Sequence, residues 1–202
     1  MRKFTAVASA LLCMTSVANA ADGGQVDMPV TVSFTGADKC VPKSISQTNV
    51  QLSAAEAAQV ESVSGYSAPT IKTGQATLTL DNCPVGTRLG VTAGGNFNSS
   101  VNMQPLNNSG QPVTSHKLDN VPQWGFDGSA AGKLGMTLFM PRAFDNGYLQ
   151  NVGKPGDISE TKLTTANQVP LTYSINAIDK VAAKSMGSGN YNSTATLIVA
   201  IK

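Results

Sequence analysis

The stretch "GNYNSTATLIVAIK", Gly189 to Lys202, decides the fold that we predict for this chain. From Tyr191 onward it reads as a β-strand, because one face carries an apolar residue at every second position: Ala195, Leu197, Val199 and Ile201. A strand at the end of a chain needs a partner for its backbone groups and a cover for its apolar face. We therefore ask which other part of the sequence supplies that cover.

The first twenty residues have the pattern of a secretory signal peptide. A basic start at positions 2 and 3 and an apolar run precede the cleavage motif Ala18-Asn19-Ala20. The run is too short for a membrane anchor, which needs about 20 apolar residues. Leu12 before Cys13 does not fit a lipoprotein, which needs a small residue there. Cleavage leaves 182 of the 202 residues, a length that suits one domain.

The mature chain shows no sign of catalytic, metal-binding or nucleic-acid chemistry. The signal peptide holds two of the 14 Lys and Arg residues and none of the 12 Asp and Glu residues, so the rest is formally neutral. Nothing in it resembles a nucleic-acid-binding basic patch. The single histidine, His116, is expected to be a solvated loop residue, because catalytic and metal sites need partners. We expect no enzyme, no cofactor and no metal.

Two cysteines remain after cleavage, Cys40 and Cys83. In an exported protein without a C-x-x-C motif, two cysteines predict one structural disulfide. The pair closes a loop of 43 positions. Loop-closure entropy for that length stabilises the folded chain by about 4 kcal/mol.

Period-two alternation between Gly, Asn and Pro residues predicts an all-β chain. The expected strands lie at 26–34, 76–83, 88–95, 133–140, 169–178 and 191–202. One short helix is expected at Ser53–Val60, where Ser53 and Glu56 form a capping-box pattern. The stretch 96–132 looks rich in loops and its fold stays open, although we expect its Trp124 to pack in the core. The pattern as a whole predicts an antiparallel β-sandwich.

Taken in order, these segments resemble the chaperone–usher pilins, the subunits of bacterial fimbriae. The likeness covers nearly the whole mature chain. An extended arm ends in "VSFTG" before Cys40, "LTLDNC" ends in Cys83, and "VPLTYSINAI" resembles a strand of the family. The terminal motif of the family has a glycine fourteen residues from the end, here Gly189, followed by an alternating apolar strand.

The resemblance implies an incomplete immunoglobulin-like sandwich that lacks its seventh strand and is completed by a donated strand. The acceptor groove, which also binds the chaperone, would be formed by Gly189, Ala195, Leu197, Val199 and Ile201. The donor face would be formed by Val26, Met28, Val30, Val32 and Phe34. Pro29 lies inside this arm and lacks a backbone N–H, so either that backbone position faces away from the acceptor strand or the donor strand starts after it. A periplasmic chaperone would cover the groove first, and the arm of the next subunit would replace it with the help of an outer-membrane usher.

The resemblance divides the chain into a signal peptide at 1–20, a donor-strand arm at 21–36 and a pilin domain at 37–202. The implied function is a structural subunit of a fimbrium on the bacterial surface that supports cell adhesion and binds other copies of itself or related pilins. The alternative is a secreted monomeric lectin-like sandwich in which residues 26–34 are an ordinary first strand, because alternation alone fits both. The receptor, the organism and the choice between major and minor subunit stay open.

Overall fold

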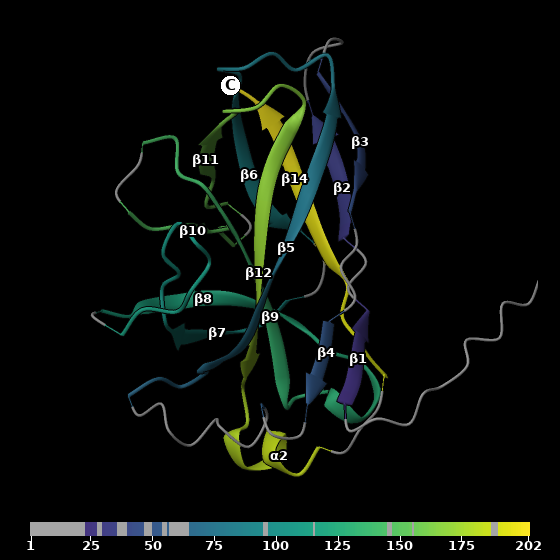
Figure 1. Ribbon diagram of the computed structural model, residues 1–202, viewed down its shortest axis with the longest axis vertical. Coiled ribbons are helices and arrows are strands. Elements are labelled where there is room, and N and C mark those ends of the chain that lie inside the picture. Colours follow the sequence, from purple (N-terminus) through teal and green to yellow (C-terminus); the bar gives the residue numbers. More distant parts are fainter. Residues whose placement is uncertain are drawn as a thin grey trace, which may run out of the picture.

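The computed structural model of this chain describes residues 23–27, 30–35, 40–46, 50–53, 56, 65–94, 97–114, 116–144, 147–154, 156–186 and 190–202. It is an all-β, sandwich-like fold with one short helix, which confirms the predicted fold class (Figure 1). The predicted signal peptide lies outside the described residues. No helix in the described part of the chain is long and apolar enough to cross a membrane.

The strands follow one another along the whole described chain. Their bounds are β1 (Gly23–Asp27), β2 (Val30–Thr35), β3 (Val41–Ile45), β4 (Val50–Ser53), β5 (Thr70–Asp81), β6 (Arg88–Gly94), β7 (Phe97–Met103), β8 (Leu118–Gly125), β9 (Leu134–Met140), β10 (Gln150–Asn151), β11 (Ser159–Lys162), β12 (Gln168–Ala177), β13 (Asn190–Asn192) and β14 (Ala195–Ile201).

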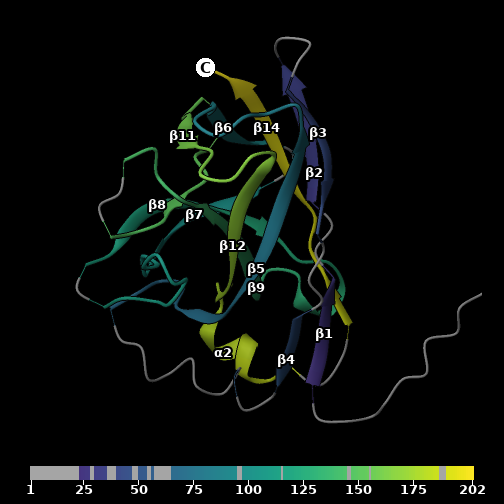
Figure 2. The ribbon, with the colours of Figure 1, turned by 45° about the horizontal axis from the view of Figure 1, so that its top comes forward.

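These strands form three sheets. The largest has the order β3-β5-β12-β9-β8-β7, with β10 added on β9. The second has the order β11-β6-β14-β2, and a small third sheet has the order β13-β1-β4. The named strands pair antiparallel except in two places, where β1 runs parallel to β13 and β2 runs parallel to β14. The two larger sheets lie one behind the other with the core between them (Figure 1, Figure 2).

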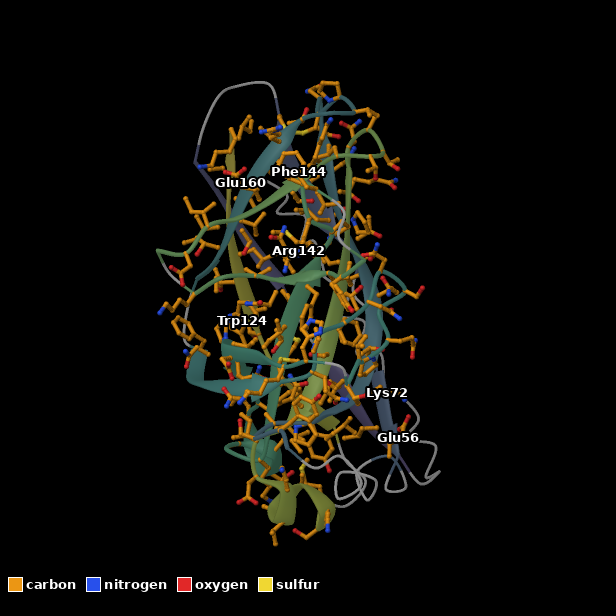
Figure 3. The ribbon with its side chains drawn as sticks, turned by 90° about the vertical axis from the view of Figure 1, so that its left-hand side faces the viewer. Glu56, Lys72, Trp124, Arg142, Phe144 and Glu160 are labelled. Carbon is orange, nitrogen blue, oxygen red and sulfur yellow. A yellow bond between two sulfur atoms is a disulfide. The ribbon has the colours of Figure 1, made fainter. Side chains whose placement is uncertain are left out.

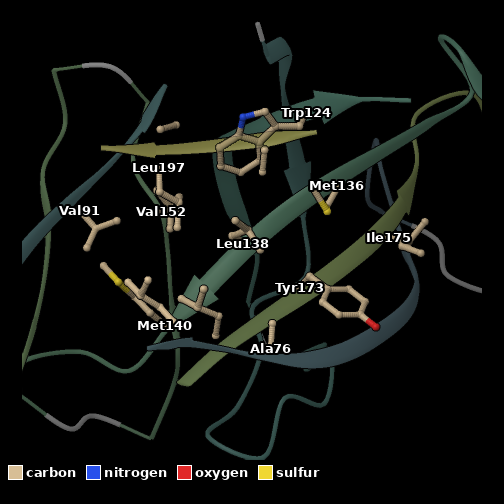
Figure 4. Close-up of a cluster of buried hydrophobic side chains, with 14 of the residues drawn as sticks. Ala76, Val91, Trp124, Met136, Leu138, Met140, Val152, Tyr173, Ile175 and Leu197 are labelled. Carbon is tan, nitrogen blue, oxygen red and sulfur yellow. The ribbon is translucent and has the colours of Figure 1, made fainter. Parts of the chain in front are cut away.

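The core fills the space between these two sheets with side chains from both. Leu78 and Leu171 come from the larger sheet, and Leu89 and Leu197 come from the second sheet. Trp124 packs among them and its indole Nε1 donates a hydrogen bond to the carbonyl oxygen of Gly94 at 3.2 Å (Figure 4). The expectation that Trp124 belongs to the core is therefore confirmed.

The stretch 96–132 contains more regular structure than its loop-like sequence indicated. It forms β7, β8 and a 3-10 turn at Gly128–Ala130. The pairing of β7 with β8 shifts register twice, and Asn120 within β8 has a φ of 57°. Such bulges interrupt period-two alternation, which explains why the sequence pattern hid these strands.

A buried polar cluster lies within the larger sheet. The Asn176 amide nitrogen donates to the Gln123 side-chain oxygen at 2.8 Å and to the Thr137 hydroxyl at 3.2 Å, and the Gln123 amide nitrogen also donates to the Thr137 hydroxyl. The Thr70 hydroxyl donates to the Asn176 side-chain oxygen at 3.1 Å. These hydrogen bonds offset the desolvation of the buried amides.

Helix α2 is a helix that the sequence analysis did not predict. Helix α2 spans Lys180–Lys184 and is capped by Asp179, whose side chain accepts from the backbone nitrogens of Val181 at 3.0 Å and Ala182 at 2.9 Å. In the predicted segment Ser53–Val60, Ser53 is the last residue of β4 and Glu56 is helical, while the remaining positions lie outside the described residues.

Candidate functional site

The C-terminal strand has the alternating burial that its sequence predicts. Ala195, Leu197 and Val199 are fully buried, whereas the intervening residues of β14 are half-buried. Ile201 is also half-buried and packs against the core. On one side β14 pairs antiparallel with β6, so one half of its backbone ladder is satisfied within the domain.

The other side of β14 is paired with the N-terminal arm of the same chain. Strand β2 runs parallel to β14 along its whole length (Figure 1). The register opposes three predicted donor residues to the three buried residues of β14, with the pairs Val30–Ala195, Val32–Leu197 and Phe34–Val199. The structure therefore brings together most of the predicted donor and acceptor residues, and it does so within one molecule.

The preceding part of the arm continues the same alignment. Strand β1 pairs in parallel with β13, and Val26 lies opposite Tyr191. Val26 and Tyr191, like Val32 and Leu197, are separated by 165 positions. The two ladders thus share one register on both sides of Pro29. Met28, Pro29 and Gly189, which the sequence analysis also named, lie outside the described residues.

Strand β2 is at the edge of its sheet. Among the described strands, its only ladder partner is β14. The sequence analysis found both strands from their alternation, but nothing in that alternation indicated the parallel direction.

The disulfide lies immediately after this arm. Cys40 and Cys83 are bonded, as predicted, with their Cα atoms 4.8 Å apart. Cys40 precedes β3 and Cys83 follows β5, and these two strands pair antiparallel with Val41 opposite Asp81. The bond is typical of a protein that folds in an oxidising, exported compartment. It also fixes covalently the point at which the arm joins the sandwich.

The chain between β13 and β14 is held by hydrogen bonds that the sequence analysis did not predict. The Ser193 hydroxyl donates to the carbonyl oxygen of Gly125 at 2.8 Å, and the backbone nitrogen of Asp127 donates to the carbonyl oxygen of Asn192 at 2.8 Å. These bonds interrupt the predicted continuous strand between β13 and β14. The sequence signal of this break is Ser193, a polar residue in phase with the apolar positions of the strand, and its side chain is buried.

The chemistry of the paired strands is apolar. His116 lies elsewhere, is exposed as predicted, and meets the Tyr148 ring edge-on with 4.8 Å between ring centroids. Within the described ranges, no three His, Cys, Asp or Glu residues form a group that would hold a metal ion. What this arrangement can do is bind a strand, through a backbone ladder and an apolar face.

No protein-family model matches the chain, and a search of the curated proteins finds no match.

Proposed function

We propose that this protein is a structural subunit of a bacterial surface fimbrium, polymerised head to tail by strand exchange and supporting cell adhesion. The observation that carries the proposal is the pairing of β2 with β14. The β2 strand is N-terminal, lies at a sheet edge and has β14 as its one ladder partner among the described strands. The same strand from a second copy would make the same contacts, as in domain swapping.

The placement of donor and acceptor at opposite ends of the sequence favours a filament. When copy A gives β2 to copy B, its own β14 takes β2 from a third copy. Such a contact is heterologous and does not close on itself. Exchange is expected to be slow, because the whole parallel ladder between β2 and β14 must be broken before β2 can leave.

The proposed partners follow from the state that precedes exchange. Without β2, the outer backbone edge of β14 would be unpaired, and an unpaired strand edge leads to aggregation. A periplasmic chaperone that lends a strand would protect it, and an outer-membrane usher would direct the exchange. The disulfide is consistent with export through the periplasm.

Peptide complementation tests the proposal. A chain that lacks Ala21–Phe34 should bind a synthetic peptide of residues 21–36 and gain heat stability from it. A peptide with Val32→Asp should not stabilise the chain, because position 32 lies opposite the buried Leu197. The matched control is Thr31→Asp, one position out of phase, which should act like the wild-type peptide. Equal stabilisation by all three peptides, or by none, would contradict the proposal.

A secreted monomeric lectin-like module is the second candidate. The structure favours it in one respect, because β2 covers β14 without a second molecule. The two candidates differ in solution. A fimbrial subunit should run as a ladder of SDS-resistant multimers that collapses on boiling, whereas a closed module should run as a monomer before and after boiling.

A further inference from the structure

An open cavity of about 420 Å³ lies beside β8, β10 and β11, and β11 is at the edge of its sheet opposite to β2. Its walls come from the start of β8, from β10, from the residue after Pro141 and from the turn that precedes β11. Figure 3 faces this side and labels Arg142 near its centre. The volume falls within the range of about 300–1,000 Å³ that is typical of small-molecule sites.

The wall beside β11 is held in place by its own hydrogen bonds. The Ser159 hydroxyl accepts from the backbone nitrogen of Gly153 at 3.1 Å and donates to the carbonyl oxygen of Asn151 at 3.0 Å. The backbone nitrogen of Ala93 donates to the Gly153 carbonyl oxygen at 2.7 Å, which ties this wall to β6. A Cβ at position 153 would overlap the Asp157 carbonyl oxygen, so only glycine fits there. The cavity is therefore largely preformed.

The polar side chains of the cavity fall into two groups. Gln150 belongs to the framework, because its amide nitrogen donates to the carbonyl oxygens of Pro141, at 3.2 Å, and of Glu160. Arg142 and Asn120 have exposed side chains that make no hydrogen bond or ion pair with the described residues. Their polar groups have no part in holding the walls, so they are available to a ligand.

The two carboxylates of the cavity are only weakly engaged. Asp119 lies 3.4 Å from the Lys117 ammonium group, and Asp157 lies 3.9 Å from the Lys154 ammonium group. All four side chains are exposed, and exposed ion pairs of this kind contribute little. Both carboxylates therefore remain able to accept hydrogen bonds from a ligand.

These side chains select a ligand by its chemistry. A guanidinium group only donates and matches a carboxylate in a two-pronged geometry, whereas aspartates only accept and require hydroxyl or N–H donors. Among the described residues of the lining, Pro122 is the one with an apolar side chain, which disfavours an apolar ligand. Arg142 and Lys154 balance the charges of Asp119 and Asp157, so the described lining is formally neutral and suits a ligand with a single negative charge better than a phosphate dianion. We propose that this cavity binds an acidic saccharide, a sugar that carries one carboxylate beside several hydroxyl groups.

In this assignment Arg142 binds the sugar carboxylate, and Asp119, Asn120 and Asp157 bind its hydroxyl groups. The site lies within one molecule and does not depend on strand exchange. It would operate equally in a fimbrial subunit and in a secreted module. Ligand binding at this cavity, or its absence, therefore neither supports nor contradicts the proposed polymerisation.

The test uses the full mature chain and three probes, sodium glucuronate, glucose and inorganic phosphate, in an NMR titration of the ¹⁵N-labelled protein. Glucuronate should shift the amide signals of the cavity residues and bind at least about tenfold more tightly than glucose or phosphate. Arg142→Gln should remove this preference. The control Arg88→Gln changes an arginine that packs on the Phe144 ring, with its guanidinium carbon 5.6 Å from the ring centroid, outside the cavity lining, and should bind like the wild type.

Three results would overturn the proposal. The first is an absence of cavity shifts with glucuronate, and the second is equal affinity for glucuronate and glucose or phosphate. The third is unchanged glucuronate binding in Arg142→Gln while the variant retains the wild-type amide spectrum elsewhere, which shows that it is folded.

Discussion

At the residue scale, Gly74 shows how a single position constrains the sandwich. It lies on β5 directly opposite Tyr173 of β12. The Tyr173 ring lies across Gly74, and a Cβ at position 74 would overlap the ring and its hydroxyl group. Tyr173 is itself buried and belongs to the core (Figure 4). Glycine is therefore required here by the cross-strand neighbour, not by its backbone conformation.

Replacement of Gly74 by alanine should destabilise the protein by about 1–3 kcal/mol, as overpacking of a core does. Thr73→Ala, one position away and half-buried, should change the free energy of unfolding by about 0.5 kcal/mol or less. Urea unfolding measures both. In a Tyr173→Leu background the Gly74→Ala cost should shrink, because the overlapping ring is gone. An equal cost in both backgrounds would show that the ring is not its cause.

The same tyrosine predicts a dependence of stability on high pH. Burial raises the pKa of Tyr173 to about 12. An exposed tyrosine has a pKa of about 10, so the unfolded chain releases this proton first as the pH rises. The stabilisation is complete below about pH 10 and is lost as the pH rises toward 12. Between about pH 9 and 11.5, the free energy of unfolding in urea should fall more for the wild type than for Tyr173→Phe. An equal fall in both proteins would argue against a raised pKa of Tyr173 as the cause.

At the element scale, β14 is the strand on which the sandwich depends. Its buried face meets the core, while one edge pairs with β6 and the other with β2. Leu197→Ala should lower the free energy of unfolding by about 2–5 kcal/mol, because it removes a fully buried side chain. Thr196→Ala, on the opposite face, should have an effect within about 0.5 kcal/mol. If chemical denaturation shows equal losses of unfolding free energy in the two variants, the assignment of Leu197 to the buried face is contradicted.

The sequence located the strands in which apolar residues recur at every second position, including the fully buried β9, and it missed strands in which this recurrence is short or interrupted. Strand β14 and the second half of β5 alternate clearly, because each buries one side there, whereas β12 alternates only at its start and is buried on both sides from Leu171 to Ala177. Every residue of β9 is buried, since a second apolar cluster that includes Met103 and Phe139 covers its outer face. Strands β8 and β11 were missed because bulges or short length hide their period.

The candidate site was predictable in its parts and not in its arrangement. Alternation located Val32 and Leu197 on apolar faces, but it carries no information on which strand lies beside which, or in which direction. The parallel ladder between β2 and β14 arises from a contact between the two ends of the chain. The cavity beside Arg142 was equally invisible, because its walls come from segments far apart in the sequence.

At the scale of the whole molecule, the disulfide lies between the two arm strands and the rest of the fold. Cys40 and Cys83 join the start of β3 to the end of β5, and β1 and β2 both precede Cys40. The paired variant Cys40→Ala with Cys83→Ala should lose about 2–5 kcal/mol of stability, measured by urea unfolding without reductant. The wild type in reductant should match it. Full stability of the variant would show that the crosslink is dispensable.

In the proposed function, β2 moves from its own β14 to that of another copy. A co-expression experiment captures such an exchange. A tagged chain that lacks Ala21–Phe34 is expressed in the periplasm with an untagged full-length chain, and the tag is purified in SDS without boiling. Wild-type untagged chain should be retained and released on boiling, whereas untagged Val32→Asp should not be retained and untagged Thr31→Asp should be. Failure to retain any untagged chain, while the full-length protein purifies as a stable monomer, would contradict strand exchange and leave β2 as a permanent strand of a closed sandwich.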